Sequence, residues 1–155
     1  MATQVPPRRA DYAWFGPVTA RWMDNDVYGH VNNAHYYSYF DTVINQYLIE
    51  RGGLDIHAST VVGFVVSSSC DFLRPVAYPE RLEVGLRVDR TGTSSVHYRV
   101  ALFAAGDDAA RAAGKVVHVF VDRASSSPVP IPAPIRRALE AIAGGDPGAA
   151  PEPPP

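Results

Sequence analysis

Residues 24–33 of this chain read Asp-Asn-Asp-Val-Tyr-Gly-His-Val-Asn-Asn, so two carboxylates, a histidine and three asparagines crowd into one short stretch. The segment that follows, residues 33–50, repeats apolar side chains at helical spacing. Asn32 or Asn33 can cap the start of this helix, and Gly52-Gly53 can end it. Backbone N–H groups and the helix dipole converge at such a start, so the polar loop is a candidate anion site.

The rest of the chain predicts a sheet and one more short helix. Alternating apolar and polar residues, or β-branched runs, predict strands at residues 18–22, 61–72, 81–89, 96–102 and 116–121. The short helix begins at Pro134 and covers residues 134–142. The four later strands have connections too short for crossovers, so we expect them to be antiparallel neighbours. The fold class is therefore α+β, with an antiparallel sheet wrapped around one long central helix and a short C-terminal helix.

Length and composition indicate one folded domain and argue against nucleic-acid binding and membrane spans. The 155 residues are 46% hydrophobic and 19% charged, which suits one domain. We expect a flexible N-terminus over residues 1–13, a domain over residues 14–143 and a disordered, proline-rich tail over residues 144–155. A net charge of −2 gives no reason to expect a nucleic-acid partner, and no apolar run is long enough to cross a membrane.

The counts of cysteine and histidine bear on redox compartment and on metal binding. Cys70 is the single cysteine, so an intramolecular disulfide is excluded and a cytoplasmic location is expected. Only His30 and His35 among the five histidines are close in sequence, and that spacing is poor for metal ligands on one helix face. We therefore expect no metal and no cofactor.

Asp26 is the residue with the most obvious chemistry in the polar loop. A carboxylate just before a helix places a nucleophile or base beside a backbone oxyanion donor. A purely structural interpretation stays open, because Asp-x-Asp before glycine is common in loops and Asn-Asn is common in caps. Cys70 lies in a predicted strand without a basic neighbour, which favours packing, and no G-x-S-x-G sequence supports a serine hydrolase.

Residues 24–33, together with Tyr36 and Tyr39-Phe40 on the helix, resemble the hotdog-fold acyl-CoA thioesterases of the 4-hydroxybenzoyl-CoA thioesterase family. In that family the pattern D-x-D-x-x-G-H-V-N-N-x-x-Y-x-x-Y opens the central helix. Residues 70–76 and 92–95 also resemble the family, so the likeness covers almost all of the predicted domain. It implies a hotdog fold and an enzyme that hydrolyses an acyl-CoA to a free acid and CoA.

The resemblance also implies roles for individual residues. Asp26 would act as nucleophile or general base, the backbone N–H of Asn33 would polarise the thioester carbonyl, and His30 would orient Asp26 or water. These three are the catalytic candidates. The candidates for substrate binding are Gly29, Asn32, Tyr36, Arg74, Arg90, Thr93, Ser94 and Ser95.

This chain differs from the family in the residues available to bind the CoA phosphates. Arg74, Arg90 and residues 93–95 are the available partners. The family often has two or three basic residues near Arg90, whereas this chain has Thr91-Gly92-Thr93 there. That difference leaves room for the phosphopantetheine of an acyl-carrier protein in place of CoA.

Several alternatives remain open from the sequence. The chain can be an acyl-carrier-protein thioesterase or a non-catalytic module that binds acyl thioesters; a hotdog dehydratase is disfavoured, because Asp26 precedes the helix. Asp41 on the helix is another candidate carboxylate, and Asp71 is a weaker one because Arg74 suggests an ion pair with it. The resemblance further implies a homodimer or homotetramer with active sites between subunits, which would also cover exposed strand edges.

Overall fold

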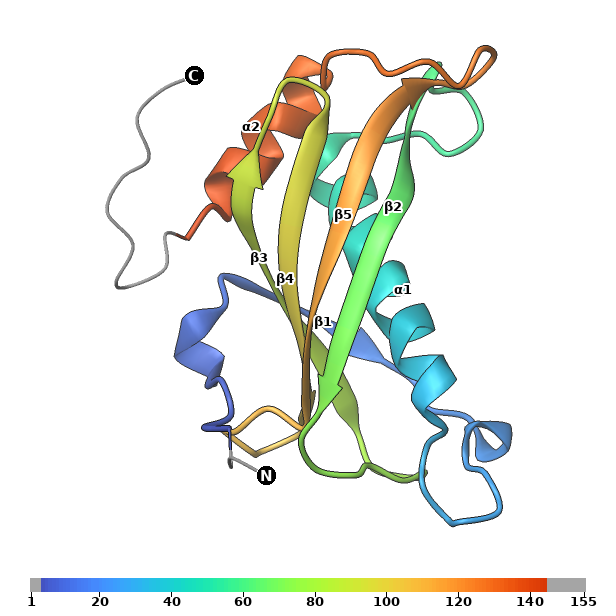
Figure 1. The fold of residues 1–155 in the computed structure, drawn as a ribbon, viewed down its shortest axis with the longest axis vertical. Coiled ribbons are helices and arrows are strands. Elements are labelled where there is room, and N and C mark those ends of the chain that lie inside the picture. The colour runs from blue at the N-terminus through green and yellow to red at the C-terminus, as the bar shows by residue number, and fades with distance from the viewer. Residues whose placement is uncertain (1–3, 145–155) are drawn as a thin grey trace.

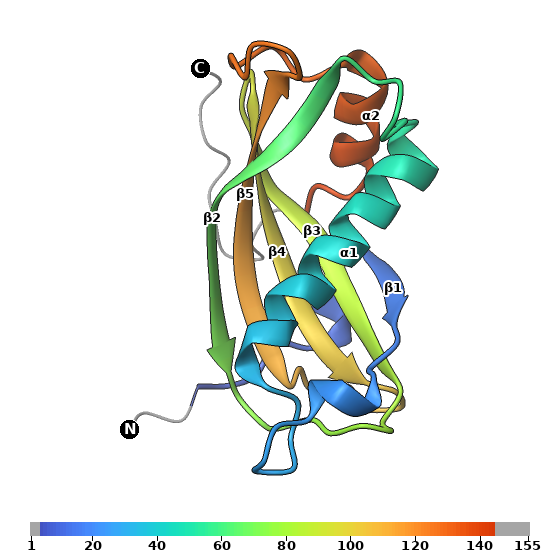
Figure 2. The same cartoon turned by 90° about the vertical axis from the view of Figure 1, so that its right-hand side faces the viewer.

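A computed structural model describes residues 4–144 of the chain. Its strands are β1 (Trp14–Val18), β2 (Val61–Phe72), β3 (Leu82–Thr91), β4 (Ser95–Ala104) and β5 (Ala112–Asp122), and its helices are α1 (Asn33–Gly52) and α2 (Ala133–Ala141). The strands form one antiparallel sheet, α1 lies across one face of it, and α2 packs beside the C-terminal end of α1 (Figures 1 and 2). This arrangement confirms the predicted α+β class, with both helices where the sequence predicts them.

The order of the strands differs from the expected one. The sheet runs β1-β3-β4-β5-β2, so β2 pairs with β5 and not with β3, its successor in the chain. Residues 73–81 connect β2 to β3 across the end of the sheet. Three strand spacings amount to about 14 Å, and nine extended residues reach roughly 30 Å, so the connection is long enough to pass two strands. The prediction that successive later strands are neighbours in the sheet was therefore wrong for β2 and β3.

The first strand lies earlier than predicted. Residues 14–18 pair with β3, whereas residues 22–24 form a turn of 3-10 helix, so the predicted strand at residues 18–22 was wrong. Pro17 weakens the strand pattern, but β1 is an edge strand, where proline is tolerated because one side of the strand carries no ladder bonds. Gly16 in β1 faces α1, and a Cβ there would lie 2.9 Å from a methyl carbon of Val43.

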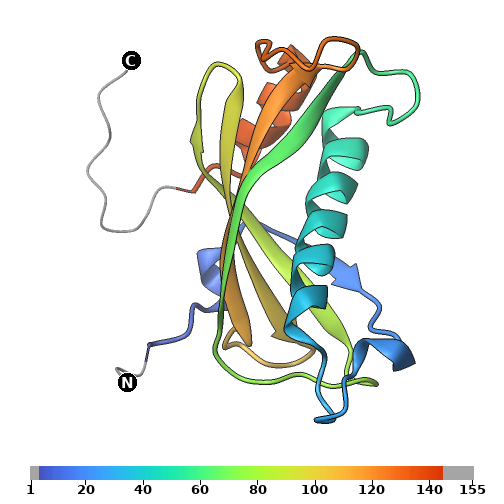
Figure 3. The ribbon, with the colours of Figure 1, turned by 45° about the vertical axis from the view of Figure 1, so that its right-hand side comes forward.

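The core forms between α1 and the sheet. The buried side chains of α1 recur at helical spacing, and Phe40, Val43 and Ile44 are fully buried on the side where α1 packs against the sheet, mainly against β1, β3 and β4. Gly53 ends the helix in the left-handed conformation, and its N–H donates to the Leu48 carbonyl. The loop before α1 and the turn between β3 and β4 lie at opposite ends of the molecule (Figure 3).

The packed part of the chain begins before residue 14. The Ala110 N–H donates to the Pro7 carbonyl, and the Arg9 guanidinium donates to the carbonyls of Ala104 and Asp107. Of the predicted tail, only Gly144 belongs to the described residues. Within residues 4–144, neither helix combines the length and the hydropathy of a membrane span.

Candidate active site

Asp26 lies in the loop between β1 and α1 and is only partly exposed. Its Oδ1 accepts a hydrogen bond of 2.9 Å from the Tyr28 N–H. Its backbone N–H donates to the His30 carbonyl at 2.9 Å, and its carbonyl accepts from the Gly29 N–H at 3.0 Å. Gly29 has a φ of +82°, a conformation that glycine adopts easily, so it allows the turn that folds the loop back on Asp26.

Asn32 connects the Asp26 carboxylate to the start of α1. Its Oδ1 caps the helix by accepting from the Ala34 N–H at 3.0 Å, and its Nδ2 donates to Asp26 Oδ2 at 3.1 Å. Asn33 is the first helical residue, and its N–H donates no hydrogen bond within the described chain. The Asn32 side chain thus holds the Asp26 carboxylate beside the start of α1, where the Asn33 N–H is available to a substrate.

Asp24 lies beneath this loop and is completely buried. Its Oδ2 accepts from the Tyr39 hydroxyl at 2.6 Å and from the Arg21 N–H at 2.9 Å, while the Asn32 N–H donates to its carbonyl. Burial alone would raise the pKa of Asp24, but the hydrogen bonds from Tyr39 and Arg21 outweigh burial and hold that pKa below its usual range. Asp24 therefore supports the loop and is not available to a substrate.

A pocket of about 260 Å³ opens at the start of α1. Its lining includes Asn33 and the buried Tyr36 from the helix, and Arg74 from the segment after β2. Asp26 is not among the lining residues and belongs to the adjoining loop. Four lining residues were not predicted as site residues from the sequence: Val31, Phe72, Leu73 and Pro75. The last three lie in the segment 70–76, which carries part of the family resemblance.

Other predicted site residues lie elsewhere. The His30 side chain is exposed and forms no hydrogen bond with the described part of the chain. Arg90 contacts His97, Thr93 and Ser94 lie in the β3–β4 turn and Ser95 begins β4, at the end of the molecule opposite to the Asp26 loop (Figure 3). A single chain therefore does not bring Arg90, Thr93, Ser94 and Ser95 together with Asp26.

The alternative carboxylates occupy separate places. Asp41 lines a second pocket, of about 450 Å³, between α1 and β2, together with Tyr37 and Ser68. Asp71 lines a hollow that also includes Lys115. The expected ion pair between Asp71 and Arg74 does not form among the described residues, and the two side chains line different hollows.

Cys70 lies on β2 and is half-buried. Burial raises the pKa of the Cys70 thiol to about 12, which disfavours the nucleophilic thiolate. Among residues 4–144, no three histidine, cysteine or acidic side chains gather in a way that could hold a metal ion.

The sheet order, the long helix and the short C-terminal helix define a hotdog-fold protein. Residues 19–139 match the family model described as the Thioesterase-like superfamily, and the chain belongs to this superfamily.

Solved structures and a curated protein are similar to this chain. The PA5185 protein of Pseudomonas aeruginosa strain PAO1 is 59% identical, with a TM-score of 0.88 over 89% of this chain and 96% of that chain. A thioesterase of Thermus thermophilus, complexed with coenzyme A and zinc, is 29% identical, with a TM-score of 0.69 over 85% of this chain and 95% of that one. The uncharacterized protein YsmA of Bacillus subtilis strain 168 is 29% identical over 92 residues, which are 58% of this chain and 62% of that relative's length.

Proposed function

We propose that this chain hydrolyses an acyl-CoA thioester to a free acid and CoA, as its resemblance to the 4-hydroxybenzoyl-CoA thioesterase family implies. One observation carries the proposal: Asn32 holds the Asp26 carboxylate beside the start of α1, where Asn33 lines a pocket and its N–H donates to no other group of residues 4–144. A non-catalytic binding module has no use for a carboxylate next to a polarised carbonyl.

The chemistry follows from these two groups. The Asn33 N–H donates to the thioester oxygen, which gains negative charge as the carbonyl carbon is attacked; one such donor lowers a barrier by roughly 3 kcal/mol. As general base, Asp26 takes a proton from water, the new C–O bond forms, the C–S bond breaks, and the proton passes to the departing CoA sulfur. As nucleophile, Asp26 attacks the carbonyl carbon, the C–S bond breaks and CoA leaves, and water then hydrolyses the acyl anhydride and restores the Asp26 carboxylate.

The pocket at Asn33 supplies the contacts to the substrate. Tyr36 packs edge-on against Phe72 with ring centroids 5.0 Å apart, which gives the pocket an aromatic wall. Arg74 is exposed at the pocket and is our candidate contact for an acidic group of CoA. That the Thermus thermophilus relative was solved with coenzyme A supports this choice of substrate.

The active form in this proposal is a homodimer or a homotetramer. Strand β2 ends the sheet, and along it Phe64, Val65 and Val66 are each about half exposed. An unpaired strand edge with apolar side chains favours pairing with a second copy. Such pairing would also let Arg90 and residues 93–95 of one subunit approach the site of the other.

The direct test is a thiol-release assay on purified protein with a panel of aromatic and aliphatic acyl-CoAs, run beside matched acyl-carrier proteins. The proposal expects turnover of at least one acyl-CoA. Turnover confined to acyl-carrier proteins would move the substrate to a phosphopantetheine carrier. Tight acyl-CoA binding without thiol release would contradict hydrolysis and support a binding module.

A further inference from the structure

The segment between β2 and β3 forms one side of the pocket at Asn33. Its first residues, Leu73, Arg74 and Pro75, line the pocket, and the rest of it runs on to Glu80. We call residues 73–80 the wall segment. It has no helix or strand of its own, so contacts with the rest of the chain must fix its conformation.

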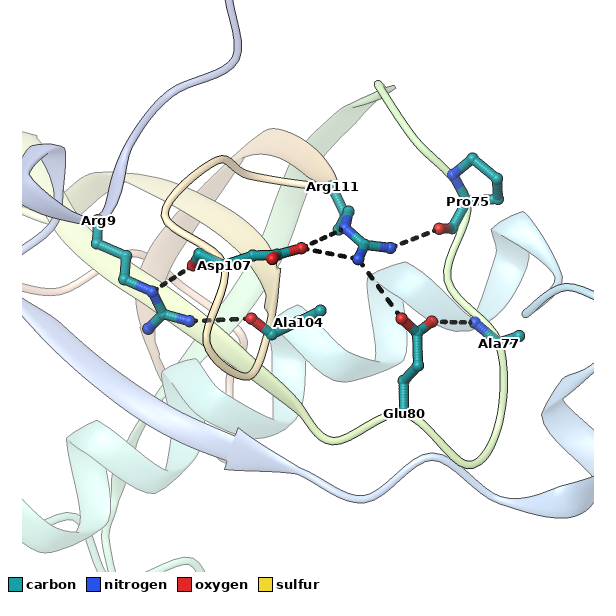
Figure 4. A network of polar contacts seen from close by, with 7 residues as sticks. All are labelled: Arg9, Pro75, Ala77, Glu80, Ala104, Asp107 and Arg111. Atoms are coloured by element: carbon teal, nitrogen blue, oxygen red, sulfur yellow. Dashed lines mark hydrogen bonds and ion pairs between the residues drawn. The ribbon is translucent and has the colours of Figure 1, made fainter.

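Arg111, at the end of the turn before β5, holds the first half of the wall segment. Its carbonyl accepts from the Leu73 N–H at 2.9 Å and from the Arg74 N–H at 3.0 Å. Its Nη1 donates to the Pro75 carbonyl at 2.9 Å (Figure 4). Three consecutive residues that line the pocket are thus fixed by one residue.

Two carboxylates hold the Arg111 guanidinium, which is almost completely buried. Asp107 Oδ2 lies 2.8 Å from Nη2 and 3.2 Å from Nε, and Glu80 Oε1 lies 3.5 Å from Nη2. The other oxygen of Glu80 accepts from the Ala77 N–H at 2.8 Å, so the second half of the wall segment is tied to the same guanidinium (Figure 4). The planar fork of arginine can make these contacts at once, and the single ammonium of lysine cannot.

The other side of the wall segment contacts the loop that carries Asp26. The Val31 N–H donates to the Val76 carbonyl at 2.8 Å, and the Tyr78 N–H donates to Asn25 Oδ1 at 3.0 Å. Asn25 directly precedes Asp26, and Val31 precedes Asn32, which holds its carboxylate. A shift of the wall segment would therefore move both ends of this loop.

We propose that Arg111 is a positioning residue for the site: it sets the pocket wall and, through that wall, the place of the Asp26 loop. The Arg111 side chain does not itself line the pocket and has no hydrogen bond to the Asp26 loop, so it acts through residues 73–80. The predicted effect of Arg111 on turnover depends on the proposed thioesterase function, whereas its predicted effect on the position of the Asp26 loop does not.

The test compares Arg111→Lys with Arg9→Lys. Arg9 is the matched control, because it binds the same turn through the carbonyls of Asp107 and Ala104 but has no contact with the wall segment (Figure 4). We expect Arg111→Lys to lower kcat/KM for the best acyl-CoA by roughly 10- to 100-fold, because small displacements of reacting groups are costly. Its KM should rise as the wall loosens, and its kcat should fall as the loop shifts. Arg9→Lys should stay within about twofold of the wild type.

Amide hydrogen exchange supplies a readout that needs no substrate. We expect the Val31 amide to exchange at least about tenfold faster in Arg111→Lys and at the wild-type rate in Arg9→Lys, while core sheet amides keep their protection in both. If Arg111→Lys does not fold, Glu80→Gln, which removes one carboxylate from the guanidinium but can still accept from Ala77, should show the same changes to a smaller extent.

Unchanged Val31 exchange in a folded Arg111→Lys protein would overturn the proposal, as would equal kinetic effects of the two lysine variants. A wild type without turnover on any thioester would instead contradict the proposed function, and the exchange measurement would still decide the role of Arg111.

Discussion

His118 is a titratable side chain buried in the core without a charged partner among the described residues. It lies on β5 facing the helix side of the sheet, only 1% exposed, with its Nδ1 3.4 Å from the Tyr98 hydroxyl. Burial lowers the pKa of His118 from 6.5 to about 4. The side chain is therefore neutral in the folded protein at neutral pH, and its protonation opposes folding.

The stability of the protein should accordingly fall on mild acidification. Between pH 6.5 and about 4 the unfolded chain binds a proton at this position and the folded chain does not, so the free energy of unfolding decreases as pH drops through this window. Between pH 7 and pH 5 the His118 contribution is roughly 2 kcal/mol. Urea unfolding at the two pH values measures it.

The control for this prediction is His118→Gln, which keeps a polar amide in place and removes the titration. Its free energy of unfolding should change much less between pH 7 and pH 5 than that of the wild type. Parallel losses in both proteins would show that other groups cause the acid sensitivity.

At the residue scale, the sequence was most informative where the chemistry is local. Asp26, Asn32 and Asn33 lie within eight positions, and a cap and a loop carboxylate can be predicted from such spacing. Arg111 could not be found in this way, because its partner Pro75 lies 36 positions away and nothing in the local sequence joins them.

At the scale of elements, the start of α1 combines a structural and a chemical function in one side chain. The Asn32 Oδ1 caps the helix, and its Nδ2 holds Asp26. Asn32→Ser should keep the cap and lose the donor, so its stability should stay near the wild type while turnover falls. Asn32→Ala should lose both, with an additional loss of about 1 kcal/mol in the free energy of unfolding.

Thermal melts and thiol-release kinetics on the two variants separate these functions. Asn45→Ala serves as a control, because within the described part of the chain the Asn45 amide donates only inside α1, to the carbonyl and the carboxylate of Asp41. Full turnover by Asn32→Ser would show that the contact from Asn32 to Asp26 is dispensable.

Element types were easier to predict than element neighbours. The helical spacing of apolar residues predicted α1, and the alternation of apolar and polar residues predicted β3 and β4. Both patterns arise because one face of the helix or strand is buried, and they can be seen in a short stretch of sequence. The neighbour of β2 depends on residues 73–81 crossing the end of the sheet, and the position of β1 depends on Pro17 lying at an edge. Both are properties of the assembled sheet.

At the scale of the whole molecule, β2 predicts self-association. We expect light scattering at micromolar concentration to give at least about twice the chain mass of 16.8 kDa. Val66→Lys, at the irregularity in β2, should shift this mass toward the monomer, because a charge on an edge strand opposes pairing.

Ile56→Lys is the matched control for the association experiment. It adds the same charge at an exposed apolar residue in the loop before β2, and should leave the mass unchanged. A wild type that scatters as a monomer would contradict the assembly.

The central claim is that Asp26 carries out thioester hydrolysis, and one comparison tests it most directly: kcat of Asp26→Asn against Asp55→Asn on the best acyl-CoA. Both aspartates accept a hydrogen bond from the N–H two residues ahead, so the two substitutions perturb similar turns. Asp26→Asn should lower kcat by roughly 10²- to 10⁴-fold with substrate binding largely kept, and Asp55→Asn should stay near the wild type. Near-wild-type turnover by Asp26→Asn would contradict the account and direct attention to Asp41 in its separate pocket.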